Sequence, residues 1–252
     1  MKIIKFRKVN IMSHRSLKDV QNRLETLQTY ELDEGEFEAK QDEAKTYKQP
    51  KDQLVAGYHK LLGEVSVQMN QMDHHMGMSP TCFMGCAFCC YFPIIVTRLE
   101  ADLLKTAINQ MEPERREHIK AHLKQYFDTY QDKLAHVESL DFDDEQFKFD
   151  YRKQWLPCPL LDTETNTCLA YESRPLPCRT YVNYMDPKIC EHNLVPEETV
   201  SFEFLYQDYM GNLNELAQDI ATEYDGVIDY PDDIFEYNLL PVFLREWIEE
   251  SS

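Results

Sequence analysis

The eight cysteines of this 252-residue chain fall into two short stretches, and this distribution constrains the fold more than any other feature. The first stretch has the spacing Cys82-x3-Cys86-x2-Cys89-Cys90, and the second has the spacing Cys158-x9-Cys168-x9-Cys178-x11-Cys190. Thiolates two or three residues apart can turn back onto one ion at a sulfur–metal distance of about 2.3 Å. Gly85 supplies the backbone freedom that such a turn requires. Adjacent side chains diverge in most backbone conformations, so Cys89 and Cys90 are expected to serve two ions, or one ligates while the other packs.

Ligation by sulfur alone selects zinc or iron over magnesium or calcium. Four early and four late cysteines predict two four-sulfur sites, or one larger cluster with spare thiols. The wide spacings of the second stretch differ from ferredoxin runs and favour single ions over an iron–sulfur cluster, without separating zinc from iron. Two alternatives stay open, namely buried free cysteines and disulfides formed in an oxidising compartment.

Charge and hydropathy exclude two classes of partner. The formal net charge of −19 repels phosphate backbones and argues against nucleic acid. No apolar run approaches the roughly 18 residues of a membrane span, and the N-terminus lacks the apolar region of a secretory signal. We therefore expect a cytoplasmic protein, whose thiols stay reduced. From Glu197 onward there are fifteen acidic residues and one arginine, which predict a solvated acidic face or a surface for a basic protein partner.

The hydrophobic pattern predicts a mainly α fold with a small β-hairpin, in which helices wrap a compact cysteine-rich metal-binding core. Helices are expected over 16–30, 51–69 and 98–110, from Pro113 onward and over much of 197–250, where Pro231 opens the last helix and Pro241 kinks or ends it. Residues 92–96 suit a buried strand, and 163–166 suit a hairpin turn. Residues 31–48 read as an acidic polar segment and 139–150 as an acidic loop. Thr97 and Glu100 form a capping box.

Three parts are expected along the chain. Residues 1–50 form a partly helical N-terminal extension. Residues 51–196 form the cysteine-cluster domain, with a helical insertion over 109–155. Residues 197–252 form an acidic helical C-terminal segment.

Other candidate residues carry weaker signals. His118 and His122 have the i, i+4 spacing of a shared metal site, but Ile119 stands where a metalloprotease motif needs glutamate, so we expect a solvated helix flank. His74 and His75 precede the first cysteines and are expected in a loop. The chain has no glycine-rich phosphate loop and no Gly-x-Ser-x-Gly elbow, which leaves nucleotide and serine-hydrolase chemistry without local support.

The cysteines and the motifs around them resemble the YkgJ-like cysteine-cluster family, which is described as a zinc- or iron-chelating domain. The resemblance covers about Cys82 to Cys190, and all eight cysteines match. It also includes the segments Pro93-Ile94-Ile95-Val96 with Glu100, Cys158-Pro159-Leu160-Leu161-Asp162, Cys168-Leu169-Ala170-Tyr171-Glu172 and Arg174-Pro175-Leu176-Pro177-Cys178-Arg179. The insertion, the N-terminal extension and the acidic tail lie outside these motifs.

The resemblance implies that all eight cysteines bind metal, as zinc or iron ligands or around an iron–sulfur cluster. Four thiolates on zinc carry a charge of −2, which Arg174 and Arg179 are expected to offset from the second coordination shell. Some members of the family are linked to lysine methylation of flagellin. An enzyme of that lysine N-methylase kind, or an iron–sulfur redox protein, is the alternative to a metal-chelating function. Glu100 is explained by its capping box and is not expected to be catalytic.

Overall fold

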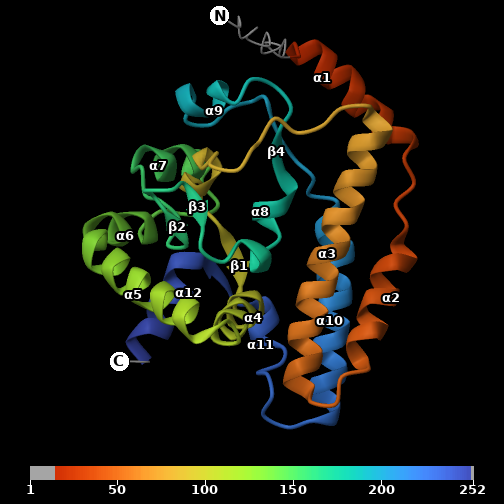
Figure 1. Ribbon diagram of the computed structural model, residues 1–252, viewed down its shortest axis with the longest axis vertical. Helices are drawn as coiled ribbons and strands as arrows, with labels where there is room; N and C mark the ends of the chain where they lie inside the picture. Colours follow the sequence, from red (N-terminus) through yellow and green to blue (C-terminus); the bar gives the residue numbers. More distant parts are fainter. Residues whose placement is uncertain (1–14, 251–252) are drawn as a thin grey trace, which may run out of the picture.

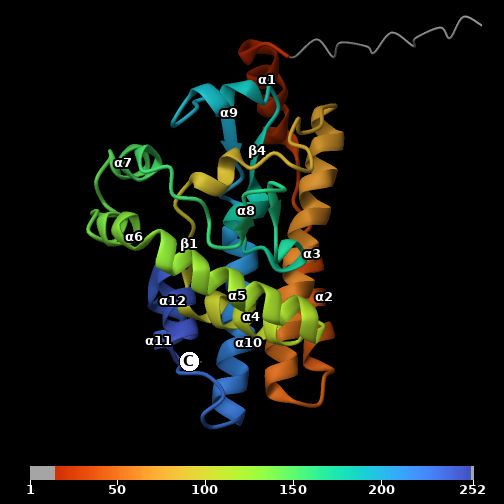
Figure 2. The same ribbon diagram turned by 60° about the vertical axis from the view of Figure 1, so that its left-hand side comes forward.

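The computed structural model describes residues 15–250, whose helices form two groups that lie side by side (Figures 1 and 2). In the first group α2 (Glu34–Lys45), α3 (Pro50–Met76) and α10 (Leu205–Glu223) each contact the other two. In the second, α12 (Leu240–Glu250) packs against α4 (Arg98–Asn109) and α5 (Pro113–Thr129), and α6 (Gln131–Glu138) and α7 (Phe147–Lys153) lie beyond them. The remaining helical turns are α1 (Leu17–Leu24), η1 (Glu25–Thr29), η2 (Phe88–Tyr91), η3 (Tyr171–Ser173), α8 (Pro177–Thr180), α9 (Lys188–His192) and α11 (Asp232–Phe235).

The long helix α3 is the backbone of the first group. The apolar stripe predicts it over 51–69, and the structure confirms that prediction and extends the helix to Met76. It starts with Pro50 in its first turn, where a missing N–H leaves no bond unmade, and it ends at Gly77, whose φ of 60° favours glycine. Tyr58 and Leu62 on its inner face are completely buried. Burial of this stripe against α2 and α10 therefore holds the group together.

The segment 31–48 contains a helix that the sequence pattern did not predict. Helix α2 buries Phe37, Gln41 and Ala44, which are spaced at four and three residues. Because these three side chains form a narrow stripe on an otherwise charged helix, the polar composition of the segment hides the pattern. The helix predicted over 16–30 is confirmed by α1 and η1.

The start of α4 confirms the predicted capping box. The Glu100 amide donates a 3.1 Å hydrogen bond to Thr97 Oγ1, and the Glu100 carboxylate accepts one from the Thr97 amide. Helix α5 begins at Pro113 as predicted, with Ile119 and Leu123 buried on its inner face. Helix α7 begins within the segment 139–150 that we expected to be a loop.

Three short antiparallel strand pairs complete the fold. β2 (Leu161–Asp162) pairs with β3 (Thr167–Cys168) around a turn in which Asn166 has a φ of 55°, which confirms the predicted hairpin. β1 (Ile95–Thr97) pairs with β6 (Tyr237–Leu239), and β4 (Tyr181–Asn183) pairs with β5 (Thr199–Ser201). The strand predicted over 92–96 thus begins only at Ile95. The mainly α fold class with small β elements is confirmed.

The two C-terminal prolines act differently from each other. Pro231 precedes the single turn α11, as predicted for a helix start, but strand β6 follows that turn. The prediction that Pro241 kinks or ends a helix is wrong, because Pro241 is the second residue of α12. Proline is tolerated there since the first helical amides have no intrahelical partner. Within residues 15–250 no helix combines the length and the hydrophobicity needed to cross a membrane.

Two glycines of α3 test how closely α3 and α10 pack. A Cβ on Gly57 would overlap Cδ2 of Leu216, which is itself completely buried in α10, whereas a Cβ on Gly63 would have no atom within 4 Å. We expect Gly57→Ala to lower the free energy of unfolding by about 1–3 kcal/mol through overpacking. Gly63→Ala should raise it by about 0.5–1 kcal/mol through helix propensity. Urea denaturation of both variants measures these changes. If both substitutions changed the free energy of unfolding equally, this would contradict the close approach of α3 to α10 at Gly57.

Candidate metal centre

The first cysteine stretch forms a loop that a β-strand fixes in place. Thr81 donates two hydrogen bonds to the carbonyl of Asn183 in β4, one from its amide at 2.7 Å and one from its hydroxyl at 3.0 Å. The loop then turns through Gly85, whose φ is 92°, and the Cys86 amide bonds to the Phe83 carbonyl at 2.9 Å. Cys82 and Cys86 therefore flank the tight turn that the sequence predicts.

The second cysteine stretch meets the first directly. The Cys158 amide donates a 2.6 Å hydrogen bond to the carbonyl of Cys90 on η2. Helix α9, which carries Cys190, also contacts η2. Cys168 ends strand β3 opposite Leu161. Two stretches separated by almost seventy residues thus converge on one short 3-10 helix, between the two helix groups (Figure 1).

The thiols fall into two neighbourhoods that do not follow the order of the chain. Burial raises the pKa of Cys190 to about 11, and the nearby sulfurs of Cys82, Cys86 and Cys89 raise it further. Cys190 therefore lies with the first stretch. We call the cysteines of this neighbourhood the outer group, which contains Cys82, Cys86, Cys89 and Cys190.

The other neighbourhood contains one early cysteine. Burial raises the pKa of Cys158 and of Cys178 well above the usual thiol value, and the Cys168 sulfur adds to both shifts. Cys90 interacts with Cys158 and Cys178. We call this set the inner group, which contains Cys90, Cys158, Cys168 and Cys178. Cys89 also interacts with Cys158 and Cys178, so it stands between the two groups, and the expected division into four early and four late cysteines stays a prediction.

Cys89 and Cys90 join the two groups. The Cys90 thiol donates a hydrogen bond to Cys89, which lowers the Cys89 pKa to about 7 against the opposing effect of desolvation. Arg174 and Arg152 lower it further. The same hydrogen bond and burial raise the pKa of Cys90 well above its usual value. The hydrogen bond and the two arginines thus favour a thiolate on this pair, and a thiolate is the form that binds metal.

All eight cysteines are free thiols, and they range from buried Cys158 to exposed Cys82 and Cys89. Within residues 15–250 no three Cys, His, Asp or Glu side chains already lie close enough together to hold an ion. Eight sulfurs are nevertheless a donor set that fits zinc or iron. Neutral thiols attract one another only weakly, so the cation itself would draw them together, as is usual for sites whose folding is coupled to metal.

The two arginines expected in the second shell differ in what they touch. Arg174 stacks on Tyr171, with 3.7 Å between its Cζ and the ring centroid, and its charge lowers the pKa of Cys89 and opposes the rise at Cys168. Arg179 donates to the carbonyls of Arg174 and Glu172 and to Ser66 Oγ, at 2.9, 2.6 and 3.0 Å. Arg179 therefore ties the loop before α8 to α3 and interacts with Cys178, whereas Arg174 acts on Cys89, Cys168 and Cys178. Their role toward a bound metal stays a prediction.

A third arginine, which no sequence motif indicates, lies beside the outer group. Arg152 is completely buried in α7, and its Nη2 donates a 3.4 Å hydrogen bond to the Cys190 carbonyl. Burial lowers its pKa, while Tyr181 and Cys190 favour its charged form. Arg152 belongs to the insertion over 109–155 and follows no recognisable spacing, so only the fold reveals that it is buried beside the cysteines.

The histidines do not add to the site. His74 and His75 lie in the last turn of α3 rather than in the expected loop, and His75 Nε2 is 3.0 Å from the Thr26 carbonyl oxygen. The loop assignment fails because α3 continues past the predicted end at residue 69. His118 is exposed, but His122 is half-buried and interacts with the Pro159 carbonyl, so the prediction of a solvated flank holds only for His118.

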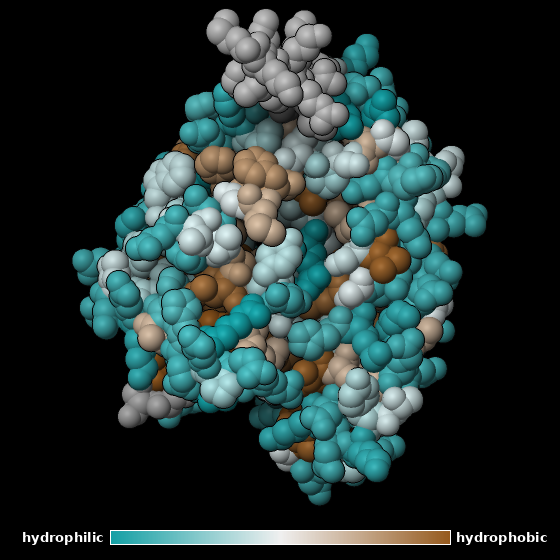
Figure 3. Space-filling view, viewed as in Figure 1, coloured by the Kyte–Doolittle hydropathy of each residue, from teal (hydrophilic) through white to brown (hydrophobic). Residues whose placement is uncertain are grey.

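The surface over this region is more apolar than its surroundings. Hydrophilic side chains cover most of the face in Figure 3, and a patch of apolar side chains gathers in its upper part. Exposed apolar residues next to the cysteines are Phe83, Met84, Trp155 and Tyr171. Met84, in the turn between Cys82 and Cys86, is 90% exposed.

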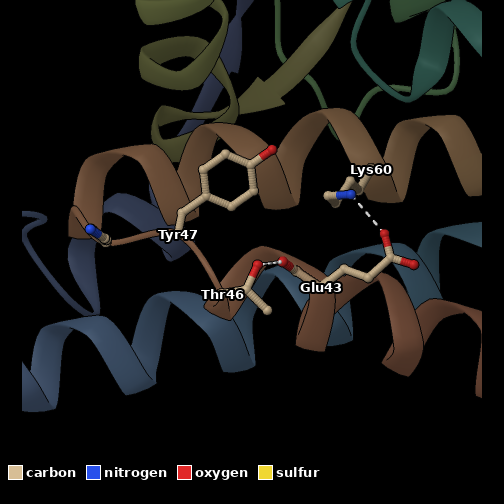
Figure 4. A pocket seen from close by; sticks show the side chains of 5 residues that line it. Glu43, Thr46, Tyr47 and Lys60 are labelled. Atoms are coloured by element: carbon tan, nitrogen blue, oxygen red, sulfur yellow. Dashed lines mark hydrogen bonds and ion pairs between the residues drawn. The ribbon is translucent and has the colours of Figure 1, made fainter.

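A surface pocket of about 470 Å³ lies apart from the cysteines, between α2 and α3 (Figure 4). In it Lys60 Nζ pairs with Glu43 Oε2 at 2.7 Å, and Tyr47 and Thr46 complete the wall. Each charged group of this pair already has its partner, and the pocket adds nothing to the thiol chemistry.

Residues 81–198 match the model of the family called CxxCxxCC, which is described as a "putative zinc- or iron-chelating domain". This match agrees with the resemblance of the segment to the YkgJ-like cluster proteins. The match covers somewhat less than half of the chain and includes all eight cysteines, together with the insertion that carries Arg152. Comparison with curated proteins and with solved structures gave no match.

Glu100 positions the loop before Cys178, and its protonation should affect stability. Burial raises its pKa to about 7, although the amides of Thr97 and Leu176 and the Tyr209 hydroxyl bond to its carboxyl group. The folded protein therefore binds the proton more tightly than the unfolded chain. Stability should fall as pH rises from about 4.5 to about 7, by up to roughly 3 kcal/mol.

Glu100→Gln tests this expectation, since the amide keeps the size of the side chain and cannot ionise. The unfolding free energy of the variant minus that of the wild type should increase as pH rises from 4.5 to 7.5. Chemical denaturation at several pH values measures it. A difference that is constant across this range would contradict the raised pKa.

Proposed function

We propose, from the match of residues 81–198 to the zinc- or iron-chelating family, that this protein binds two metal ions through two sets of four sulfurs. The outer group would hold one ion and the inner group the other. The observation that carries the proposal is the convergence of both cysteine stretches on η2, where the Cys158 amide bonds to the Cys90 carbonyl.

The adjacent cysteines explain why two ions fit better than one. Cys89 neighbours sulfurs of both groups, whereas Cys90 neighbours Cys158 and Cys178. The Cys89 and Cys90 thiols are hydrogen-bonded to each other, and on metal binding each would turn toward a different set. Four thiolates with tetrahedral geometry are a common structural site for zinc, and they also suit iron.

The chemistry of the donor set supports a structural or metal-handling role. Zinc or iron, when bound, would cross-link segments that otherwise meet through few backbone hydrogen bonds, so metal binding would add to the free energy of folding. We place the protein in the cytoplasm, where eight thiols stay reduced. A lysine N-methylase-like activity, iron–sulfur redox chemistry and a basic partner for the acidic C-terminal segment remain expectations from the sequence.

Pairs of cysteine substitutions test both the number of ions and the grouping. The protein would be prepared anaerobically, and its zinc and iron would be measured per chain. We expect two equivalents in the wild type. Cys82→Ser with Cys190→Ser should leave one, because both residues belong to the outer group. Cys90→Ser with Cys190→Ser should leave none tightly bound, because each group loses a ligand.

The matched control is Met84→Ser, which removes an exposed sulfur from the same loop and should retain both equivalents. If the cysteines were grouped by their order in the chain, Cys82 and Cys190 would belong to different sites. Cys82→Ser with Cys190→Ser would then leave no tightly bound metal ion. Wild-type protein without zinc or iron, and with unchanged melting in the presence of a strong chelator, would refute the proposed function.

A further inference from the structure

Arg152 lies in an aromatic box beside the outer group. Its side chain is completely buried, and its guanidinium carbon lies 4.3 Å from the ring centroid of Trp155, 5.2 Å from that of Phe92 and 5.5 Å from that of Tyr91. Such contacts favour a cation over the ring faces. Tyr91 belongs to η2 itself, so the box is built partly from the segment that carries Cys89 and Cys90.

The guanidinium has donors that no described residue uses. Nη2 reaches the Cys190 carbonyl at 3.4 Å, but Nε and Nη1 are buried and have no hydrogen-bond partner. The ionisable groups that interact most strongly with the guanidinium are phenols and thiols, namely Tyr181, Cys190, Tyr91 and Cys89, with no carboxylate among them. A buried cation without a charged partner is costly, so its retention calls for a compensating negative charge.

Among the described groups that interact most strongly with Arg152, the cysteines can supply this charge as a thiolate–metal centre. Four thiolates on a divalent ion carry a net charge of −2, and sulfur accepts hydrogen bonds from N–H donors. The buried guanidinium, with Nε and Nη1 unbonded, therefore lies beside a cluster of sulfurs that would become fully anionic on binding a metal ion.

We infer that Arg152 is the counter-cation of the outer metal centre, a positioning residue that stabilises the loaded thiolates of Cys89 and Cys190 and not the metal-free fold. The inference rests on the proposed function and deepens it. It assigns to Arg152 the role that the sequence suggested for Arg174 and Arg179.

Arg152→Met separates this role from simple packing, because methionine fills buried space without charge. In the reduced, metal-free protein we expect a melting temperature equal to or above that of the wild type, since replacing an unpaired buried charge by an apolar group is neutral or stabilising. In competition with a chromophoric chelator, the same variant should bind the more weakly held of the two Zn²⁺ ions roughly 10- to 100-fold less tightly. Arg152→Lys keeps the charge and should lose clearly less affinity.

The control is Lys153→Met, which removes the adjacent cation of α7, whose ion pair with Asp150 is exposed. It should leave zinc affinity unchanged. If the role of Arg152 is purely structural, Arg152→Met lowers the melting temperature equally with and without zinc and leaves the zinc affinity unchanged. This result would overturn the inference. If Arg152→Met does not fold without zinc, Arg152→Gln replaces it. Equal zinc affinities of Arg152→Gln and Arg152→Lys would then refute the role of Arg152 as counter-cation.

The two proposals fail in different ways. Wild-type protein that binds no Zn²⁺ in the titration refutes the proposed function. Wild-type protein that binds Zn²⁺ with an affinity that Arg152→Met does not change refutes only the role of Arg152.

Discussion

The hydrogen bond from the Cys158 amide to the Cys90 carbonyl is the contact on which the cysteine-rich region depends. It attaches the second cysteine stretch to η2, which carries the hydrogen-bonded pair Cys89 and Cys90. The buried apolar cluster that contains Ala87, Ile94, Cys158 and Leu160 holds the same two stretches together around this bond. The backbone therefore brings the two stretches together before any metal is considered, and this reduces the entropy that a metal must overcome.

The two helix groups hold the cysteine loops from opposite sides. The loop before η2 is bonded to β4 through Thr81, and the loop before α8 is bonded to α3 through Arg179 and to α4 through Glu100. The β1–β6 ladder fixes the beginning of α4 to the C-terminal part of the chain. The cysteines thus lie on short, individually weak elements whose ends are anchored in rigid helices. Such a frame keeps the thiols near one another and leaves their side chains free to rotate onto an ion.

Local signals predict much of this fold. The stripe of α3, the capping box of Thr97 and the turn at Asn166 each depend on a few neighbouring residues, and all three are confirmed. Helix α2 was missed because its buried stripe is narrow, and Pro241 was misjudged because the sequence does not show where a helix begins. Strand β1 has its partner in β6, more than a hundred residues away, and no local pattern could identify that pairing.

The site shows the same division between local and long-range information. Spacing alone singles out all eight cysteines, but only the fold reveals that Cys190 interacts with the early thiols and Cys90 with late ones. Arg152 lies in a segment without any motif, and only tertiary packing brings it to η2. Extended X-ray absorption of the metal-loaded protein measures the coordination shell most directly. The account predicts four sulfur atoms per ion at about 2.3 Å. A shell dominated by nitrogen or oxygen atoms would contradict it.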